Sequence, residues 1–169
     1  YRLRQGVRAL FAFARPVDEA LAAQYLSPAL LARFRQMRRS EKQHSLRVLR
    51  ALLNGSNVSP ALATAALLHD VGKTNYPMSL PQRSLPVLVK AFSPALLLRL
   101  SAHDPRSAWT RGFVVYVHHP AWSGEIIAAG GGSADAVWLA AHHADDADGW
   151  RDHPLYGDLV RLQHADDHE

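Results

Sequence analysis

One short run of the chain places an imidazole beside a carboxylate at the end of an apolar stretch. His69 and Asp70 follow residues 65–68, all Ala or Leu, and precede Val71, Gly72 and Lys73. Burying two adjacent polar side chains costs free energy unless they are paired or bind a cation. Imidazole nitrogen and carboxylate oxygen both ligate divalent metal ions. The run therefore predicts a metal-binding pair, with a backbone turn at Gly72 and a positive charge from Lys73 at the rim.

Further histidines and acids recur along the chain, on or near the ends of predicted helices. They are His44, His118-His119, His142-His143 and Asp166-Asp167. In a helical bundle, side chains from separate helices can meet at one site, so the series predicts a shared metal centre. A second His-Asp pair, His103-Asp104, is followed by Pro105, which favours a loop. We interpret that pair as unrelated to the centre.

The elements that must position these residues are predicted to be helices. Caps, prolines and glycines predict helices at about 3–14, 19–26, 28–38, 41–54, 61–70, 84–92, 94–101, 107–118, 120–129, 134–143 and 155–167, with a loop over 74–83. Residues 113–117 could form a strand, but no second strand-like run is present to pair with them, so we predict helix. The predicted fold class is all-α, a compact multi-helix bundle with the metal site at helix ends.

Composition narrows the class of protein. The 169 residues are 48% hydrophobic and 20% charged, as in ordinary globular domains. Cysteine is absent, which excludes disulfides, thiolate metal sites and cysteine nucleophiles. No apolar run approaches the ~20 residues of a membrane span, and no signal-peptide pattern opens the sequence. We therefore expect a cytoplasmic protein without a membrane segment.

The formal charge changes sign along the chain. Residues 1–50 carry +8, residues 51–134 carry +3, and residues 135–169 carry −7, for a net charge of +4. A basic half can attract phosphates or nucleic acid. We interpret the arginines as solvating outer helix faces, because Phe11, Phe13 and Phe34 are typical of a core rather than of an exposed base-stacking platform. Nucleic acid is not expected as a partner.

The His/Asp series resembles the HD superfamily of metal-dependent phosphohydrolases. The likeness rests on three parts of the chain: His44, the run His69-Asp70-Val71-Gly72-Lys73, and Asp166. It extends to His119-Pro120 and His142-His143, as in members that hold two metal ions, including the HD-GYP type, and covers about residues 40–167. No Gly-Tyr-Pro follows His143, so that motif's cyclic-dinucleotide specificity is not implied.

The resemblance implies a role for each matched residue. His44, His69, Asp70 and Asp166 would hold a first ion, with Asp70 bridging to a second set completed by His119, His142 and His143. His118 and Asp167 stay open as alternatives to their neighbours, and Glu41 is a further ligand candidate one turn before His44. Asp70 and Lys73 would be catalytic, and Lys73 and Arg83 would contact substrate phosphate. One or two ions are expected, iron or manganese first, with nickel, cobalt or zinc as alternatives, because a His-rich set suits transition metals better than magnesium.

The expected function is enzymatic. We expect hydrolysis of a phosphate ester or anhydride in a small-molecule substrate, a nucleotide, through a metal-activated water. The alternative is a catalytically silent or regulatory HD module that binds a metal or nucleotide within a larger protein, and a dinuclear iron oxygenase of the same fold is a third candidate. Residues 40–169 would form the HD domain, and residues 1–39 a helical extension packed on it.

Overall fold

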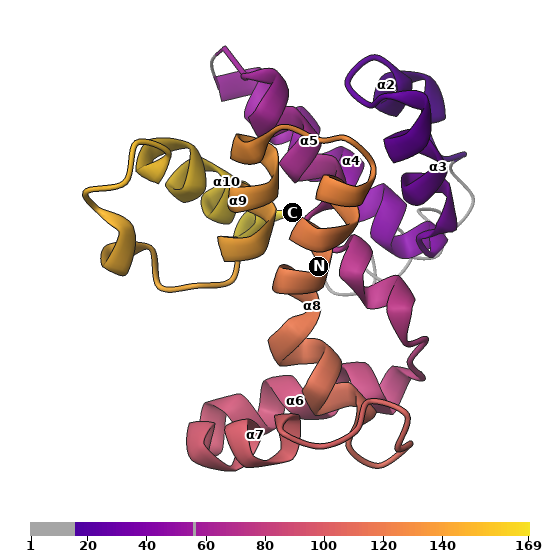
Figure 1. Cartoon of the computed structure of the whole chain (residues 1–169), viewed down its shortest axis with the longest axis vertical. Helices are drawn as coiled ribbons and strands as arrows, with labels where there is room; N and C mark the ends of the chain where they lie inside the picture. Colours follow the sequence, from indigo (N-terminus) through magenta and orange to yellow (C-terminus); the bar gives the residue numbers. More distant parts are fainter. Residues whose placement is uncertain (1–15, 56) are drawn as a thin grey trace, which may run out of the picture.

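The described residues fold as a set of helices joined by short connections (Figure 1). The computed structural model describes residues 16–55 and 57–169, which contain no β-strand. The helices are α2 (Glu19–Ala23), α3 (Pro28–Gln36), α4 (Arg39–Gly55), α5 (Pro60–Leu68), η1 (Val71–Asn75), α6 (Leu80–Phe92), α7 (Pro94–Ser101), α8 (Arg111–Ala129), α9 (Ala134–His142), η2 (Ala147–Trp150) and α10 (Tyr156–His168), where η marks 3-10 helices. The all-α prediction is confirmed, and the helix predicted over 3–14 lies outside the described residues.

Serine caps explain several of these starts. The hydroxyl oxygens of Ser27, Ser59 and Ser133 each accept a hydrogen bond from the backbone N–H three residues further on. Such a bond satisfies one of the free N–H groups of a first helical turn. After Ser27 and Ser59 the next residue is Pro, whose missing N–H is not needed at that position. The helix starts predicted at these serines are confirmed.

Three other starts differ from the prediction, and one of them is that of α8, which begins at Arg111 rather than at about 107. α6 begins at Leu80, inside the predicted loop, because Pro81 lies in its first turn and Ser79 forms a capping box with Gln82. α4 begins at Arg39 rather than after Ser40. In α4 the Glu41 carboxylate accepts a hydrogen bond from the backbone N–H of Arg38 at 3.0 Å, so Glu41 supports the first turn from within.

Pro120 does not divide the chain into two helices as predicted, because α8 continues through it. A proline lacks the N–H that would bond to the carbonyl four residues earlier, here that of Tyr116. The ring nitrogen Nδ1 of His119 lies 3.0 Å from that Tyr116 oxygen. A side chain of the predicted metal centre thus occupies the acceptor that the proline leaves open.

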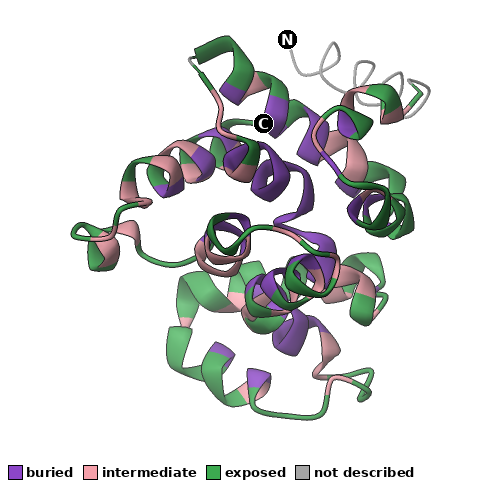
Figure 2. Ribbon diagram, turned by 45° about the horizontal axis from the view of Figure 1, so that its top comes forward, coloured by how far each residue is buried: buried purple, intermediate pink, exposed green. Residues whose placement is uncertain are grey.

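The apolar core lies at the end of the molecule that holds α2 to α5, α9 and α10 (Figure 2). α5 is buried along all its length from Leu62 to Leu68, as expected of a helix that is apolar on every side. Phe34 of α3 is fully buried in this same core, so the described part of residues 1–39 packs with the rest of the chain. The division at residue 39 stays a prediction.

Helix α8 connects this core to a second part of the molecule. Its C-terminal half packs against α9 and η1, and its N-terminal half carries α6 and α7, which lie at the opposite end from α2 and α3 (Figure 1). None of the described helices has the length and apolar content that a membrane span requires.

Candidate metal centre

Four of the predicted ligands meet where α4, α5 and α10 come together. His44 Nε2 lies 2.6 Å from Asp166 Oδ1, and His69 Nε2 lies 3.4 Å from the same oxygen. His69 Nε2 is also 3.8 Å from Asp70 Oδ2. His44 is on α4, Asp166 is on α10, and His69-Asp70 form the junction between α5 and η1. Residues separated by more than 120 positions are therefore within the reach of one ion.

A second group shares Asp70 with the first. Asp70 Oδ1 lies 3.2 Å from Nε2 of His119 and 3.9 Å from Nε2 of His143. One ligand atom of each of these three residues lies within 4.8 Å of the others. His119 comes from α8, and His143 ends α9. Asp70 thus stands between two groups of potential ligands, each large enough to hold one ion.

Backbone carbonyls hold three of the imidazoles so that their Nε2 atoms face the carboxylates of the two groups. Nδ1 of His69 lies 3.0 Å from Ala66 O, Nδ1 of His119 lies 3.0 Å from Val115 O, and Nδ1 of His143 lies 2.8 Å from Ala140 O. A carbonyl oxygen only accepts hydrogen bonds, so Nδ1 carries the proton, and the neutral ring keeps its lone pair on Nε2. This is the arrangement by which protein metal sites fix their histidine ligands.

His69 is the most deeply buried member of the cluster. Its side chain is 1% exposed, and its Nε2 makes no hydrogen bond to any described residue. An unpaired polar atom in a protein interior costs about 1–3 kcal/mol. Because Nε2 faces the carboxylates of Asp70 and Asp166, a cation held between these groups could satisfy it.

The electrostatics of the centre keep the Asp70 carboxylate ionised, favour a positive charge on His69 and keep His143 neutral. Burial would raise the pKa of Asp70, but Lys73, His69 and His119 outweigh burial and hold its pKa well below the ordinary value. Burial would lower the pKa of His69, but the negative fields of Asp70 and Asp166 raise it. Burial, with His69 and His119, lowers the pKa of His143 to about 3. His143 is therefore neutral near pH 7 and has a lone pair available for a metal.

Gly72 allows η1 to approach α8 closely enough to bring Asp70 beside His119. A Cβ atom at Gly72 would overlap the backbone oxygen of His119 and lie 2.9 Å from Ser123 N. The Gly72 N–H instead donates to Ser123 Oγ at 2.9 Å, and that hydroxyl donates to His119 O at 2.8 Å. Gly72 does not have a positive φ angle. The chain turns here, as predicted, but close packing against α8, rather than a left-handed backbone conformation, requires glycine at this position.

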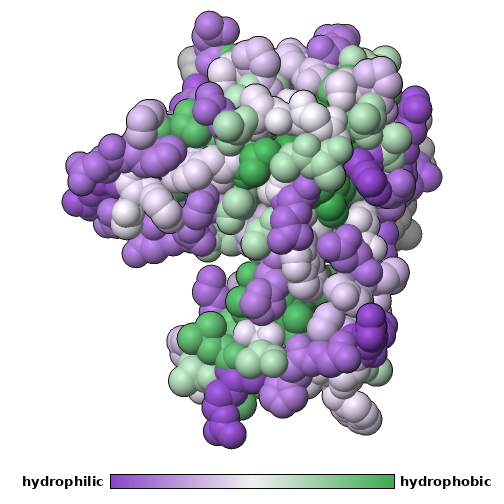
Figure 3. All heavy atoms as spheres, in the orientation of Figure 1, coloured by the Kyte–Doolittle hydropathy of each residue, from purple (hydrophilic) through white to green (hydrophobic). Residues whose placement is uncertain are grey.

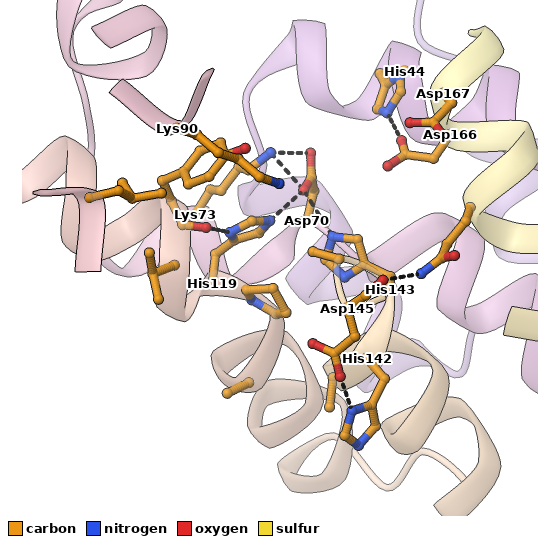
Figure 4. Close-up of a pocket in the computed structure, with 18 of the residues that line it drawn as sticks. His44, Asp70, Lys73, Lys90, His119, His142, His143, Asp145, Asp166 and Asp167 are labelled. Carbon is orange, nitrogen blue, oxygen red and sulfur yellow. Dashed lines mark hydrogen bonds and ion pairs between the residues drawn. The ribbon is translucent and has the colours of Figure 1, made fainter. Parts of the chain in front are cut away.

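A cleft of about 800 Å³ opens beside the centre. Lys73 Nζ lies 2.7 Å from both oxygens of Asp70, and Lys90 Nζ lies 5.8 Å from the centre of the Tyr116 ring. Figure 4 shows both lysines on the same side of Asp70. The cleft is lined by His44, Asp70, Lys73, Lys90, Leu97, Leu98, Tyr116, Val117, His119, Pro120, Ala121, Ala141, His142, His143, Ala144, Asp145, Gln163, Asp166 and Asp167.

The structure does not bring His142, a predicted ligand, into either group of potential ligands. Its Nδ1 lies 2.6 Å from Asp145 Oδ2, and its ring lies against those of Trp138 and Trp150, with centroids 4.7 and 4.4 Å away. Figure 4 shows it directed away from Asp70. Successive side chains on a helix point about 100° apart, and His143 occupies the inward direction.

Arg83 is also placed differently from its predicted contact with substrate. Its Nη2 lies 2.6 Å from the Glu41 carboxylate, which is buried, and Arg83 does not line the cleft. The same contact turns Glu41 away from a role as ligand. Lys90, two helical turns after Arg83 on α6, lines the cleft instead. Sequence reasoning missed Lys90, since no local signal in the sequence marks it as part of a site.

Among the alternatives left open, the structure places Asp166 and His119 in the ligand groups. Asp167 lines the cleft but does not belong to either group. His118 directs Nε2 to the backbone oxygen of Ser101 at 3.2 Å. His103 is exposed, with Nδ1 3.0 Å from Arg99 O, so the second His-Asp pair lies outside both groups.

Comparisons with known proteins found no relative: no family model, no curated protein and no solved structure matches the chain. The chemistry of the site must therefore be judged from its donor set. Four imidazoles and two carboxylates converge on both sides of Asp70. Three of the rings are held by backbone carbonyls at Nδ1, and the buried Nε2 of His69 has no hydrogen bond. This set fits divalent transition metals, for which imidazole and carboxylate are ordinary ligands.

Proposed function

We propose that the protein is an HD-type, metal-dependent phosphohydrolase that cleaves a phosphate ester or anhydride in a small-molecule nucleotide, acting in the cytoplasm. The single observation that carries this proposal is the buried His69 Nε2, which has no hydrogen bond and faces the carboxylates of Asp70 and Asp166. The six converging side chains match the residues on which the resemblance to the HD superfamily rests. His142, the seventh residue in that comparison, is not needed for either ligand group.

The described residues would hold one or two ions, with iron or manganese the first candidates. His44, His69, Asp70 and Asp166 would hold the first ion. Asp70, His119 and His143 would hold the second ion. When bound, such ions supply a water of lowered pKa and neutralise charge on a phosphoryl group.

The remaining polar residues of the cleft fit an anionic substrate. Lys73 and Lys90 both line it, and their ammonium groups can bind phosphoryl oxygens as point charges. Lys73 also holds the Asp70 carboxylate through both of its oxygens at 2.7 Å, which limits rotation of the shared ligand. The imidazoles of His119 and His143 are fixed by backbone carbonyls, so no side-chain rearrangement is needed to present their Nε2 atoms.

The proposal is tested by measuring metal content and hydrolysis together. The purified chain, loaded with Mn²⁺ or anaerobically with Fe²⁺, is assayed against a panel of nucleoside mono-, di- and triphosphates and cyclic nucleotides for product release. Asp70→Ala is compared with Asp104→Ala, which alters the other His-Asp pair. We expect Asp70→Ala to lose metal and to reduce kcat/KM at least a hundredfold, because truncating a shared ligand disrupts both groups. Asp104→Ala should retain both properties.

Two outcomes contradict the proposal in different ways. Bound metal without hydrolysis of any phosphoester in the panel would favour a regulatory module that keeps the metal site. A folded protein that takes up no transition metal would reject the metal centre itself.

A further inference from the structure

The helical hairpin α6–α7 exposes an unusual amount of apolar surface. Ten large apolar side chains are exposed among the described residues, and eight of them lie between residues 80 and 109. Phe92 is 88% exposed and Trp109 is 91% exposed. We call these eight the α6–α7 surface: Leu80, Leu85, Val87, Leu88, Phe92, Leu96, Leu98 and Trp109. A concentration of this kind on one part of a protein marks an interaction site.

Figures 2 and 3 show where this surface lies. α6 and α7 are mostly exposed along their lengths (Figure 2). Apolar side chains gather on this end of the molecule, beside the hollow that separates it from the rest (Figure 3). Leu98 belongs to the surface and also lines the cleft. Lys90 of α6 lines the same cleft. The surface is therefore continuous with one wall of the candidate active site.

The charges in this part of the chain are almost all positive. Residues 76–111 contain five basic side chains and a single acidic one, Asp104. Asp104 accepts a hydrogen bond from the backbone N–H of Arg106 at 2.8 Å. Within the described part of the chain, the ion pair made by this segment is that of Arg83 with Glu41. Lys90, Arg99 and Arg106 therefore add to the positive potential around the apolar side chains.

We propose that the α6–α7 surface docks on the anionic surface of a lipid bilayer. Exposed Leu, Val, Phe and Trp side chains beside Lys and Arg are the features by which surface helices lie in a bilayer interface. Acidic headgroups complement Lys90, Arg99 and Arg106, and the acyl region takes up the apolar side chains. A second copy of the chain fits less well, because it would bring two positively charged segments together.

Docking of this kind affects the substrate's approach to the cleft. Lys90 and Leu98 belong both to the bound segment and to the cleft wall. The mouth of the cleft would then lie next to the headgroup region. Vesicle binding itself requires neither the metal nor hydrolysis, so it can be measured whatever the outcome for the proposed activity.

The test is vesicle co-sedimentation of the full chain in its metal-free form. Vesicles of phosphatidylcholine alone are compared with vesicles in which about one-third of the lipid is phosphatidylglycerol. The apolar variant is Leu88→Ser with Phe92→Ser, and its matched control is Leu53→Ser with Val160→Ser, two exposed apolar side chains elsewhere. We expect the anionic vesicles to bind the wild type, the apolar variant to bind at least tenfold more weakly, and the control to bind as the wild type does.

A second pair of variants tests the contribution of positive charge to vesicle binding. Arg99→Gln with Arg106→Gln should weaken binding to the anionic vesicles about 25-fold, since each cation near such a surface contributes about fivefold. Arg33→Gln with Arg151→Gln removes two cations elsewhere and should change binding little. Absence of vesicle binding, or binding that survives both α6–α7 variants, would overturn the proposal. So would a wild-type dimer that Leu88→Ser with Phe92→Ser converts to monomers, because a second copy would then cover the surface.

Discussion

The candidate metal centre and the α6–α7 surface depart from ordinary protein packing in opposite ways. The centre buries polar groups, including His69, Asp70, His119 and His143, whereas α6 and α7 expose Leu and Phe side chains. Both arrangements cost free energy unless a partner compensates. A buried group of convergent donors suits a small ion, whereas a broad apolar face suits an extended partner. The extent of each region therefore indicates the size of the partner that would suit it.

Among the effects that distinguish the two regions, we expect the largest change in the free energy of unfolding from the addition of metal. Mn²⁺ at about a hundred times its Kd should raise the free energy of unfolding by about 2.7 kcal/mol, which corresponds to a Tm increase of roughly 5–10 °C. The ion would satisfy the buried donors of the centre. Differential scanning calorimetry with and without metal measures the shift. The same increase in His69→Ala would show that the ion binds elsewhere.

Gly72 should be far less tolerant of a side chain than a glycine outside the packed centre. Gly72→Ala should reduce the free energy of unfolding by about 2 kcal/mol, because the new methyl group overlaps the α8 backbone and forces a shift. Gly157→Ala on α10 is the matched control, since a Cβ atom at that position would extend into open space. Urea denaturation measures both variants. Equal destabilisation would contradict the close packing of η1 on α8.

Adjacent histidines should differ in their effect on metal binding. His119→Ala should weaken metal binding at least tenfold, equivalent to about 1.4 kcal/mol, because it removes one of the three donors in the group of Asp70, His119 and His143. His118→Ala should leave the affinity unchanged, since its ring contacts Ser101 rather than the centre. Isothermal titration calorimetry compares the two variants. If His118→Ala weakened metal binding as much as His119→Ala does, the assignment of His119 alone as a ligand would be wrong.

The smallest effect on stability is expected at the α6–α7 surface. Leu88→Ser and Phe92→Ser should each change the free energy of unfolding by less than about 0.5 kcal/mol, because both side chains are already exposed to water. Leu62→Ala, a fully buried control in α5, should cost about 2–5 kcal/mol. Thermal unfolding of the purified variants makes the comparison. A loss of several kcal/mol in the surface variants would mean that another part of the chain covers this face.

Local signals in the sequence predicted much of the fold correctly. Ser27, Ser59 and Ser133 predicted helix starts because a cap depends on residues within one turn. Two of the differences involve prolines, whose effect depends on their position in a helix. Pro81 was interpreted as part of a loop but lies in a first turn, and Pro120 was expected to end a helix that instead continues.

The sequence by itself determined the kinds of donor available, since imidazoles and carboxylates at helix ends already predicted a cation site. Only the tertiary structure decided which donors face it. His143 belongs to a potential ligand group and His142 does not, Lys90 rather than Arg83 lines the cleft, and Gly72 packs against α8. The physical reason is that each choice depends on how far a helix is rotated about its axis and where it packs, and contacts distant in the sequence set both.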